Sequence, residues 1–361
     1  MQTVNVDLAD RSYTVVIGSG LLGKPHPALE MAVGSTVLVV SNETVAPLYL
    51  EKLCASLNGK NIHSIILPDG ESFKTMEHWS LIIDKLIEIR ATRDATVLTL
   101  GGGVIGDMGG FAAASYMRGI NFIQVPTSLL AQVDASVGGK TGFNHAEGKN
   151  LIGAFHQPVA VLIDIETLDT LPAREFSAGL AEVVKIAAVR DAKFLEWLED
   201  SHAEIMARKP EVLASMIQQS VANKAAIVAE DEREAGIRAL LNFGHSFAHA
   251  LETLTHYQQY LHGEAVAIGM MVASRLSELR GFCEPGFSDR IGRLMQSFNL
   301  PLVLPETLDT NDMLAAMKLD KKVIAGIARL ILVKSAGQGF IDSTSDRHQI
   351  AAAISASHEQ L

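Results

Sequence analysis

Short apolar segments rich in β-branched residues alternate with segments of helical spacing over the first half of the chain. The apolar segments predict strands at Thr36–Val40, Ile62–Leu67, Thr96–Leu100, Phe122–Val125 and Val159–Ile163. Between two of them, Trp79, Ile82 and Leu86 fall on one stripe of a helix predicted over 77–89. Strands that alternate with helices form βαβ units, so this pattern predicts a mainly parallel, Rossmann-like sheet.

The segments before and after this region have other patterns. Val4–Leu8 and Ser12–Ile17 predict a β-hairpin in front of it. From Pro172 onward the chain is rich in Ala, Leu, Glu and Lys at helical spacing, and only Leu330–Val333 and Phe340–Ser343 look extended. We therefore expect an α/β domain over residues 1–171 and a mostly α-helical domain over residues 172–361.

The composition is that of a folded globular protein with an acidic surface. Of the 361 residues, 48% are hydrophobic, and the net charge is −11. Such a chain is a poor general binder of nucleic acid or anionic membrane, so an anionic ligand requires a local basic cluster. The N-terminal residues lack the features of a signal peptide, no apolar run reaches the roughly 18 residues of a membrane helix, and the two cysteines match no disulfide or metal pattern. We expect a cytoplasmic protein without nucleic-acid or membrane partners.

A glycine-rich turn follows the strand predicted at 95–100. Gly101, Gly103 and Gly106 match G-x-G-x-x-G, and a helix is predicted directly after them, over Met108–Tyr116. This arrangement is typical of dinucleotide binding, because glycines let the backbone approach a pyrophosphate at a helix N-terminus. The acidic residue expected about 20 positions later for the ribose is missing from Asn121–Thr127.

Two further segments are compatible with nucleotide binding. Asp69 to Lys74 directly follows a predicted strand and offers carboxylates and an ammonium to ribose hydroxyls, although an exposed turn before a helix fits the same residues. Gly139-Lys140-Thr141 resembles the end of a phosphate-binding P-loop, but the first glycine of that motif is replaced by Asp134. A nucleoside triphosphatase is therefore not expected.

Histidines and a carboxylate suited to metal binding lie in the helical half. His245 and His249 are four residues apart on one helix face, and His262 opens a later apolar helix. Upstream, Glu182 and Lys185 share a helix face. Two imidazoles and one carboxylate form a normal catalytic zinc set, but histidines on a half-buried helix also occur for packing alone. The spacing leaves both readings open.

Taken together, these motifs are far more specific than any one of them. Their order along the chain is DGESFK (69–74), GGGVIGD (101–107), PTSLLAQVDASVGGKT (126–141), GKNLIGAF (148–155), the Glu182 and Lys185 segment, NFGHSFAH (242–249) and HGE (262–264). In this order and spacing the chain resembles the 3-dehydroquinate synthase family, one of the sugar phosphate cyclases. The resemblance extends from about residue 60 to Asp320-Lys-Lys322. Ser128, Ala135 and Ala248 depart from the usual family residues, without loss of a charged or ligating group.

The resemblance implies both a reaction and a set of cofactors. The substrate is 3-deoxy-D-arabino-heptulosonate 7-phosphate, and the products are 3-dehydroquinate and phosphate. NAD oxidises the C5 hydroxyl, phosphate leaves by β-elimination, NADH returns the hydride, and an intramolecular aldol step closes the ring. The implied enzyme is a lyase of aromatic amino acid biosynthesis that uses NAD and zinc, or cobalt in the same site.

The resemblance also assigns residues. The implied metal ligands are Glu182, His245 and His262. The implied catalytic residues are Lys140, Lys185, Lys224, Arg238, Asn242 and His249. These six also bind substrate, together with Arg118, Asp134, Lys149, Asn150, Lys321 and Lys322. The implied NAD contacts are Asp69, Gly70, Glu71, Ser72, Phe73, Lys74, Gly103, Val104, Ile105, Gly106, Asp107, Thr127, Ser128, Lys140, Lys149, Thr167, Leu168, Asp169 and Thr170. The family is usually homodimeric, and Arg118 is the residue expected to reach a neighbouring subunit.

Three other functions fit parts of the pattern. A related cyclase acting on sedoheptulose 7-phosphate or glucose 6-phosphate would share the fold and cofactors, but its substrate lacks a carboxylate, and Lys224 and Arg238 are present to bind one. A polyol dehydrogenase would not need so many phosphate-binding cations. A non-catalytic sugar-phosphate sensor would not need a complete ligand set with an open metal position.

Overall fold

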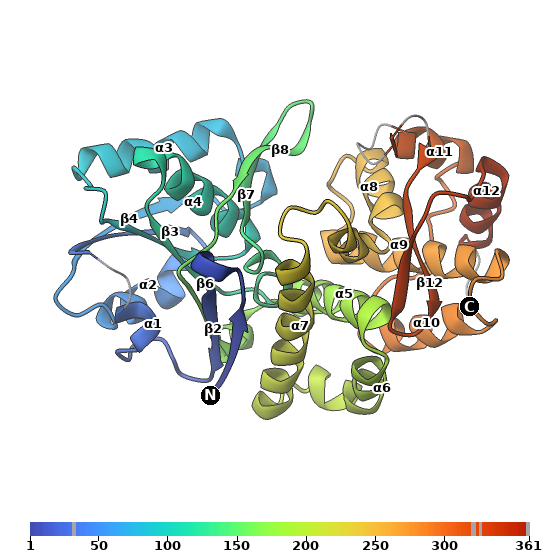
Figure 1. Cartoon of the computed structure of the whole chain (residues 1–361), viewed down its shortest axis with the longest axis horizontal. Coiled ribbons are helices and arrows are strands. Elements are labelled where there is room, and N and C mark those ends of the chain that lie inside the picture. The colour runs from blue at the N-terminus through green and yellow to red at the C-terminus, as the bar shows by residue number, and fades with distance from the viewer. Residues whose placement is uncertain (31–33, 319–322, 325–326, 359–361) are drawn as a thin grey trace. The chain divides into compact units, whose positions relative to one another are not determined.

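The computed structural model describes residues 1–30, 34–318, 323–324 and 327–358. Contacts divide the chain into two compact units (Figure 1). The first contains Met1–Leu171 and Leu213–Arg233, and the second contains Pro172–Val212 and Glu234–Leu361. Residues 213–233, which we expected in the helical domain, therefore belong to the first unit.

A seven-stranded sheet forms the centre of the first unit, in the order β1-β2-β9-β6-β5-β3-β4. The strands are β1 (Gln2–Val6), β2 (Tyr13–Gly18), β3 (Thr36–Asn42), β4 (Asn61–Leu67), β5 (Thr96–Gly101), β6 (Asn121–Pro126) and β9 (Ala160–Asp164). Only the β1–β2 pair is antiparallel; the other neighbours in this sheet are parallel. The predicted hairpin and the predicted mainly parallel sheet are both confirmed.

The central strands of this sheet, β3, β5, β6 and β9, are buried on both faces, which explains why they are mostly apolar. Successive residues of β3 point to opposite faces: Val37 and Val39 join one core cluster, and Leu38 and Val40 join the other. The first cluster includes residues of α1 (Pro27–Glu30) and α2 (Ala46–Ala55), and the second includes residues of α3 (Met76–Glu88) and α4 (Gly103–Ser115).

Other elements of the first unit differ from expectation. Helix α4 begins at Gly103, five residues before the predicted start at Met108, so the glycine motif forms its first turn. An unpredicted antiparallel hairpin pairs β7 (Lys140–His145) with β8 (Gly148–Phe155). Lys140 thus opens a strand, not the helix that a P-loop requires. Most of α7 (Pro210–Glu230) also belongs to this unit.

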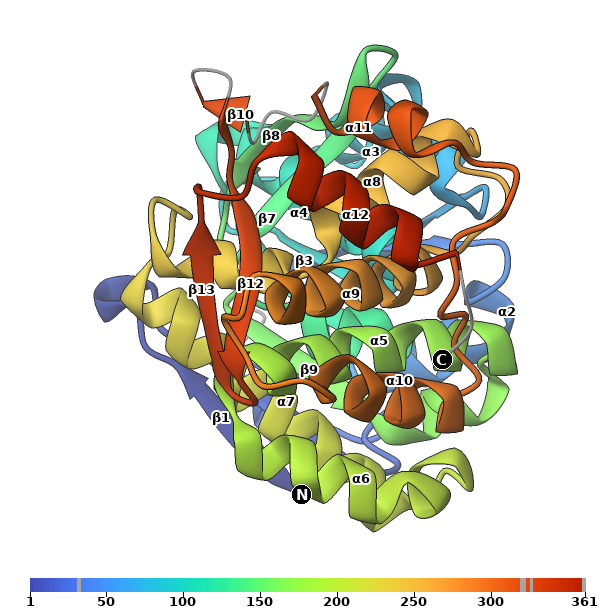
Figure 2. The same ribbon diagram turned by 90° about the vertical axis from the view of Figure 1, so that its right-hand side faces the viewer.

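The second unit is mainly helical, as predicted. Its helices are α5 (Ala173–Arg190), α6 (Ala192–Met206), α8 (His245–Leu254), α9 (His262–Leu279), α10 (Phe287–Ser297), α11 (Thr310–Lys318) and α12 (Arg347–Ala356). Helix α9 lies between α5 and α12 (Figure 2) and is buried on all sides over 263–274, so its sequence is apolar with little periodicity.

Two small hairpins complete the second unit. The two extended segments predicted near the C-terminus pair as β12 (Leu330–Ser335) and β13 (Gln338–Asp342). The short strands β10 (Val323–Ile324) and β11 (Ile327–Ala328) were not predicted. Among the helices that the structure describes, none combines the length and apolarity needed to cross a bilayer.

Candidate functional site

The carboxyl edge of the first unit's sheet contains a reversal in strand order. From β3 the chain passes to β4 on one side, and then to β5 on the other side of β3. In open parallel sheets, ligands bind at such switch points, outside the carboxyl ends of the strands. Asp69 follows β4, and Gly102 and Gly103 follow β5. The nucleotide motifs of the sequence therefore meet at the edge where this fold binds ligands.

The end of β3 holds Asp69 in place. Asn42 Nδ2 donates to Asp69 Oδ1 over 2.7 Å, and Thr44 Oγ1 donates to Asp69 Oδ2 over 2.7 Å. Each carboxylate oxygen keeps a lone pair that a ribose hydroxyl can use. The sequence analysis missed Asn42 and Thr44; the available signal was the change from apolar to polar residues where β3 ends.

The first turn of α4 is suited to bind an anion. Gly102 precedes the helix and supplies no side-chain cap, and a hydrogen bond runs from Gly106 N to Gly102 O over 3.1 Å. The amides of residues 103–105 lie before that bond, at the positive end of the helix dipole. A Cβ added at Gly106 would lie 2.8 Å from Gln124 Oε1, so this glycine permits close packing of α4 on β6. These features fit a pyrophosphate.

Lys74 connects three segments of the candidate nucleotide site. It is only 4% exposed, and its Nζ donates to Asp107 Oδ2 over 2.5 Å and to Asn150 Oδ1 over 2.6 Å. Burial by itself would lower the pKa of Lys74, but the carboxylates of Asp107 and Glu71 outweigh it and raise that pKa above its ordinary value. Lys74 therefore stays charged and links η2 (Glu71–Phe73), α4 and β8.

Asn144, on β7, fixes the hairpin to the same segment. Its backbone N–H donates to Lys74 O over 2.8 Å, and its Nδ2 donates to Glu71 Oε1 over 2.8 Å. Its Oδ1 accepts from Asn150 N over 2.9 Å. One side chain thus orients both a residue assigned to NAD and a residue assigned to substrate. The sequence analysis missed Asn144 because it did not predict the hairpin.

A cavity of about 260 Å³ lies beside η5 (Ile165–Thr170) and α2. Thr167, Asp169 and Thr170 line it, and the hydroxyl of Tyr49 on α2 lies 2.6 Å from Thr170 Oγ1. Leu168 is fully buried in the core and does not line this cavity. Three of the four residues assigned to NAD in this segment therefore border an open space.

Lys224 belongs to the first unit, and the implied metal ligands belong to the second. From α7 its Nζ donates to Asp134 Oδ1 over 2.5 Å and to Asp134 O over 2.7 Å. Asp134 belongs to the short π-helical turn η4 (Ala131–Ala135) after β6. This buried ion pair places a cation and a carboxylate assigned to substrate side by side.

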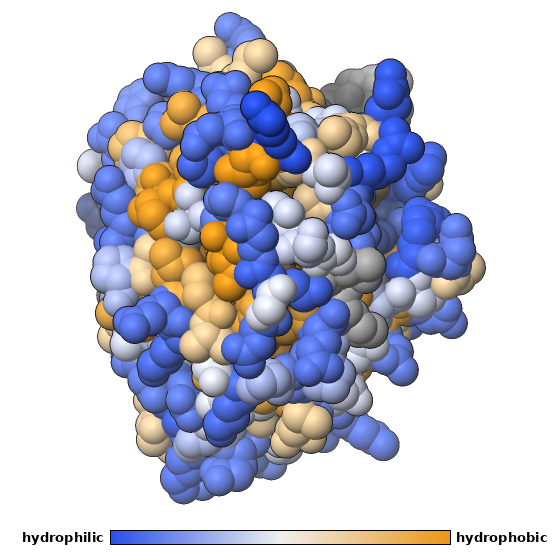
Figure 3. Space-filling model, turned by 90° about the vertical axis from the view of Figure 1, so that its left-hand side faces the viewer, coloured by the Kyte–Doolittle hydropathy of each residue, from blue (hydrophilic) through white to orange (hydrophobic). Residues whose placement is uncertain are grey.

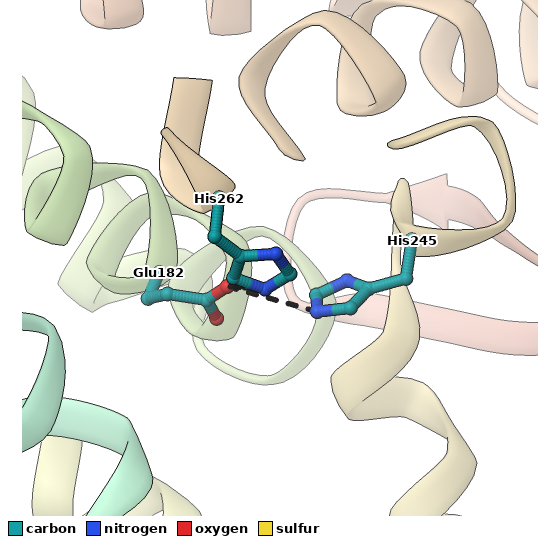
Figure 4. A group of neighbouring side chains, drawn as sticks. All are labelled: Glu182, His245 and His262. Atoms are coloured by element: carbon teal, nitrogen blue, oxygen red, sulfur yellow. Dashed lines mark ion pairs between the residues drawn. The ribbon is translucent and has the colours of Figure 1, made fainter. Parts of the chain in front are cut away.

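A candidate metal centre lies in the second unit. Glu182 of α5, His245 of α8 and His262 of α9 point toward one another (Figure 4), and their ligand atoms all lie within 4.8 Å of one another. Glu182 Oε1 is 3.7 Å from His245 Nε2 and 3.7 Å from His262 Nε2. Within the described part of the chain, no hydrogen bond reaches this buried oxygen.

Glycines bring the three helices close enough to form this cluster. A Cβ at Gly263 would lie 1.9 Å from Ala178 O, one turn before Glu182 on α5. A Cβ at Gly269 would lie 2.2 Å from Gly244 O, directly before His245. Any side chain at either position would separate the helices that carry the ligands.

The hydrogen bonds of the two imidazoles involve their Nδ1 atoms and turn their Nε2 atoms toward Glu182. His245 Nδ1 lies 3.3 Å from the carbonyl oxygen of Phe243, and His262 Nδ1 lies 3.3 Å from Glu252 Oε1. A carbonyl and an ionised carboxylate can only accept, so each Nδ1 carries the hydrogen and each Nε2 keeps its lone pair. Three electron-rich atoms therefore face one point, which fits a divalent metal with N and O ligands.

The second unit also contains groups that could bind an anionic substrate. Lys185 is buried and forms an ion pair with Glu182 Oε2. Arg238 is 1% exposed in η6 (Ile237–Asn242), and Asn242 Nδ2 donates to Glu234 Oε1 over 2.7 Å. The ring of His249 lies 5.6 Å from that of His245 between centroids. Glu234 and Glu252 were not singled out from the sequence.

Comparison with known proteins decides the family. The family model described as 3-dehydroquinate synthase N-terminal matches residues 64–178, and the one described as 3-dehydroquinate synthase C-terminal matches residues 179–323. The 3-dehydroquinate synthase of Hydrogenovibrio crunogenus is 52% identical over 341 residues, which is 94% of this chain and 95% of that protein. The chain belongs to the 3-dehydroquinate synthase family. A second member, from Pseudomonas putida, is 50% identical over 361 residues, covering 100% of this chain and 99% of its own.

The fold of this chain is also similar to that of a solved structure. The 2-epi-5-epi-valiolone synthase of Streptomyces hygroscopicus, a protein with NAD⁺ and Zn²⁺ bound, is 33% identical and has a TM-score of 0.88. The alignment covers 97% of this chain and 98% of that one. The two-unit fold is therefore that of the sugar phosphate cyclases.

The residues assigned from the resemblance are divided between the two units. The first unit contains the segments assigned to NAD, together with Asp134, Lys140, Lys149, Asn150 and Lys224. The second contains the metal ligands with Lys185, Arg238, Asn242 and His249. Arg118 is exposed in a turn with φ of 66°. Lys321 and Lys322 lie outside the described residues.

Proposed function

We propose that the chain catalyses the 3-dehydroquinate synthase reaction, which converts 3-deoxy-D-arabino-heptulosonate 7-phosphate to 3-dehydroquinate and phosphate. The observation that carries this proposal is identity of about 50% to proteins of that name over nearly the full length of both chains. Retention of the charged and ligating residues supports it, because the chain keeps the acidic, basic and imidazole side chains that the reaction requires.

The first unit would be the NAD-binding domain. When bound, NAD would supply an acceptor for the hydride on the substrate carbon that carries the hydroxyl, and the reduced cofactor would be the donor that returns it. The chain's own part is to hold the cofactor: the amides at the start of α4 would face the pyrophosphate, and Asp69 would accept from ribose hydroxyls. Lys74 would hold Asp107 and the β7–β8 hairpin in position beside the cofactor.

The second unit would bind metal through Glu182, His245 and His262. Zn²⁺, or Co²⁺ in its place, supplies a Lewis acid that polarises a substrate oxygen when bound. Lys185 would limit the negative charge on Glu182. His249, with its ring beside that of His245, would exchange a proton with the leaving phosphate.

The remaining assigned residues would bind the two anionic groups of the substrate. Lys140, Lys149, Asn150 and Asn242 offer donors suited to phosphate and hydroxyl oxygens. Lys224 and Arg238 would meet the carboxylate. A buried guanidinium such as that of Arg238 has its strongest partner in a carboxylate that it can bind through two nitrogens.

We also propose a homodimer in the cytoplasm. Among the described residues, most large apolar side chains with high exposure belong to the first unit, including Met76, Ile87 and Phe155. In Figure 3, apolar side chains gather in patches among polar ones on one face. Exposed apolar patches are typical of protein interfaces. Arg118, in its exposed turn, would reach the neighbouring subunit; light scattering of the purified protein tests the assembly.

The direct test is release of inorganic phosphate from 3-deoxy-D-arabino-heptulosonate 7-phosphate in the presence of NAD. Reactions with and without a metal chelator run beside the same reactions on sedoheptulose 7-phosphate. The proposal requires chelator-sensitive release from the first substrate only. Release from sedoheptulose 7-phosphate alone would assign the chain to a sister cyclase activity, and release from neither would contradict catalysis.

A further inference from the structure

Glu252 is a buried carboxylate on α8 that no motif of the sequence identified. It is 3% exposed, and its Oε1 lies 3.3 Å from Nδ1 of His262. The other nitrogen of the same ring, Nε2, lies 3.7 Å from Glu182 Oε1. The imidazole of His262 is therefore held between two carboxylates, one on each side.

Glu252 lies on the same face of α8 as the candidate metal ligand His245. Glu252 follows His245 by seven residues, which is two helical turns, so both side chains leave the same face of α8. One helix thus supplies a metal ligand, His245, and the group that contacts the ligand His262 of α9. A movement of α8 would displace both histidines together.

The two histidines differ in what fixes their Nδ1 atoms. For His245 the acceptor is the backbone carbonyl of Phe243, which is neutral and close in the chain. For His262 the acceptor is a charged side chain from another helix. A carboxylate fixes the tautomer as a carbonyl does, and it also makes the imidazole a stronger base and so a better metal ligand.

His262 has more need of such a partner than His245. It is the first residue of α9, and its side chain is 35% exposed compared with 10% for that of His245. The backbone of the preceding residue is held by Glu264, whose Oε2 accepts from Leu261 N over 2.8 Å. That hydrogen bond does not determine the rotation of the His262 imidazole ring. Glu252 Oε1 lies within reach of Nδ1 and can determine that rotation.

We propose that Glu252 is a positioning residue for the metal centre, which orients His262 and raises its affinity for a divalent cation without itself binding the metal. This inference rests on the proposed function insofar as Glu182, His245 and His262 must bind metal. A purely structural role for Glu252, as a buried group that only holds α8 against α9, makes different predictions.

The test measures Zn²⁺ affinity of the purified full-length protein by competition with a chromophoric chelator. The variants are Glu252→Gln, which keeps size and an acceptor oxygen but removes the charge, and Glu252→Asp, which keeps the charge but shortens the side chain. The matched control is Glu278→Gln: Glu278 also accepts hydrogen bonds, from Gly286 N and Ser288 N, but at the far end of α9.

We expect Zn²⁺ affinity to fall about 10- to 100-fold in Glu252→Gln, to fall less in Glu252→Asp, and to change less than about twofold in Glu278→Gln. The melting temperature of the metal-free protein should change little in Glu252→Gln. The visible spectrum of bound Co²⁺ should also shift in Glu252→Gln, because the ligand geometry changes.

Zn²⁺ affinity equal to that of the unmodified protein in both Glu252 variants would overturn the inference, as would a lower melting temperature of the metal-free protein with unchanged affinity. If Glu252→Gln cannot be purified, Glu252→Asp alone decides the question by the same criteria. Absence of Zn²⁺ binding in the unmodified protein would instead overturn the proposed function, so the two failures are distinguishable.

Discussion

At the scale of single residues, buried charges carry most of the functional information. Lys74, Lys185, Arg238 and Glu182 are all nearly inaccessible to solvent, although charged side chains are rarely buried unless they are paired. The motifs singled out Lys74, Glu182 and Lys185, and the family resemblance singled out Arg238, but neither predicted that these side chains are buried. Burial depends on which distant segments cover each side chain, and one sequence does not show that.

Replacement of Lys74 tests whether its ion pair holds the nucleotide site together. Lys74→Ala would leave Asp107 without its partner in a buried position, and removal of one member of such a pair costs about 3 kcal/mol of unfolding free energy. Lys85→Ala is the control, because Lys85 pairs with Glu88 on the exposed face of α3 and should cost less than about 1 kcal/mol. Equal losses in urea denaturation would contradict this account of Lys74.

Asp342 should make the free energy of unfolding depend on pH in the acid range. Its burial favours the neutral form, but hydrogen bonds from Ser345 and Thr344 outweigh that effect and lower its pKa from the ordinary 3.8. A lowered pKa in the folded state stabilises the protein above pH about 4, and this contribution disappears as pH falls through the folded-state pKa. Asp342→Asn should lose that part of the pH dependence. Identical slopes of unfolding free energy against pH in both proteins below pH about 5 would contradict the assignment.

At the scale of helices and strands, close helix contacts determine the metal centre. Gly263→Ala would place a methyl group against Ala178 O and push α9 away from α5, and so separate His262 from Glu182. We expect at least a tenfold loss of Zn²⁺ affinity, together with destabilisation of about 1–3 kcal/mol. Gly102→Ala is the control, because its Cβ would meet Ser128 Oγ at an ordinary 3.4 Å in the first unit. Normal Zn²⁺ affinity in Gly263→Ala would show that the contact does not position the ligands.

The β7–β8 hairpin should control cofactor affinity through Asn144. Asn144→Ala removes the hydrogen bonds to Glu71 and from Asn150, each worth about 1 kcal/mol, so the dissociation constant for NAD should rise by up to about 30-fold. His145→Ala, at the exposed neighbouring position, should leave the constant within about twofold. Calorimetric titration with NAD distinguishes the two, and equal effects would contradict a specific role for Asn144.

The sequence predicted elements well where one physical pattern dominated. The buried parallel strands β3, β5 and β9 are uninterrupted apolar runs, and their limits were predicted to within about two residues. The hairpin β7–β8 was missed because its strands mix glycines, charges and amides, and because Gly142 and Gly153 serve close backbone contact and not side-chain packing. The start of α4 was placed too late because glycine is a poor helix former, and only the tertiary contacts of Gly106 with β6 show why glycine is tolerated there.

At the scale of the whole molecule, the residues assigned to the two cofactors belong to different units. The residues assigned to NAD lie in the first unit and the metal ligands lie in the second. The sequence located the boundary at residue 171, but it did not show that residues 213–233 return to the first unit and bring Lys224 to Asp134. That return is a long-range contact with no local signature. Asn144 and Glu252 escaped notice for the same reason, since each acts on a residue in another element.

The central claim is that one chain oxidises and then reduces the same substrate carbon, with no net redox change. The decisive measurement uses 3-deoxy-D-arabino-heptulosonate 7-phosphate carrying deuterium at C5, with NAD, and follows NADH, phosphate and the isotope in the product. The account predicts that phosphate is released, that NADH does not accumulate, and that the 3-dehydroquinate keeps its deuterium. Accumulation of one NADH per phosphate, or loss of the deuterium to solvent, would contradict it.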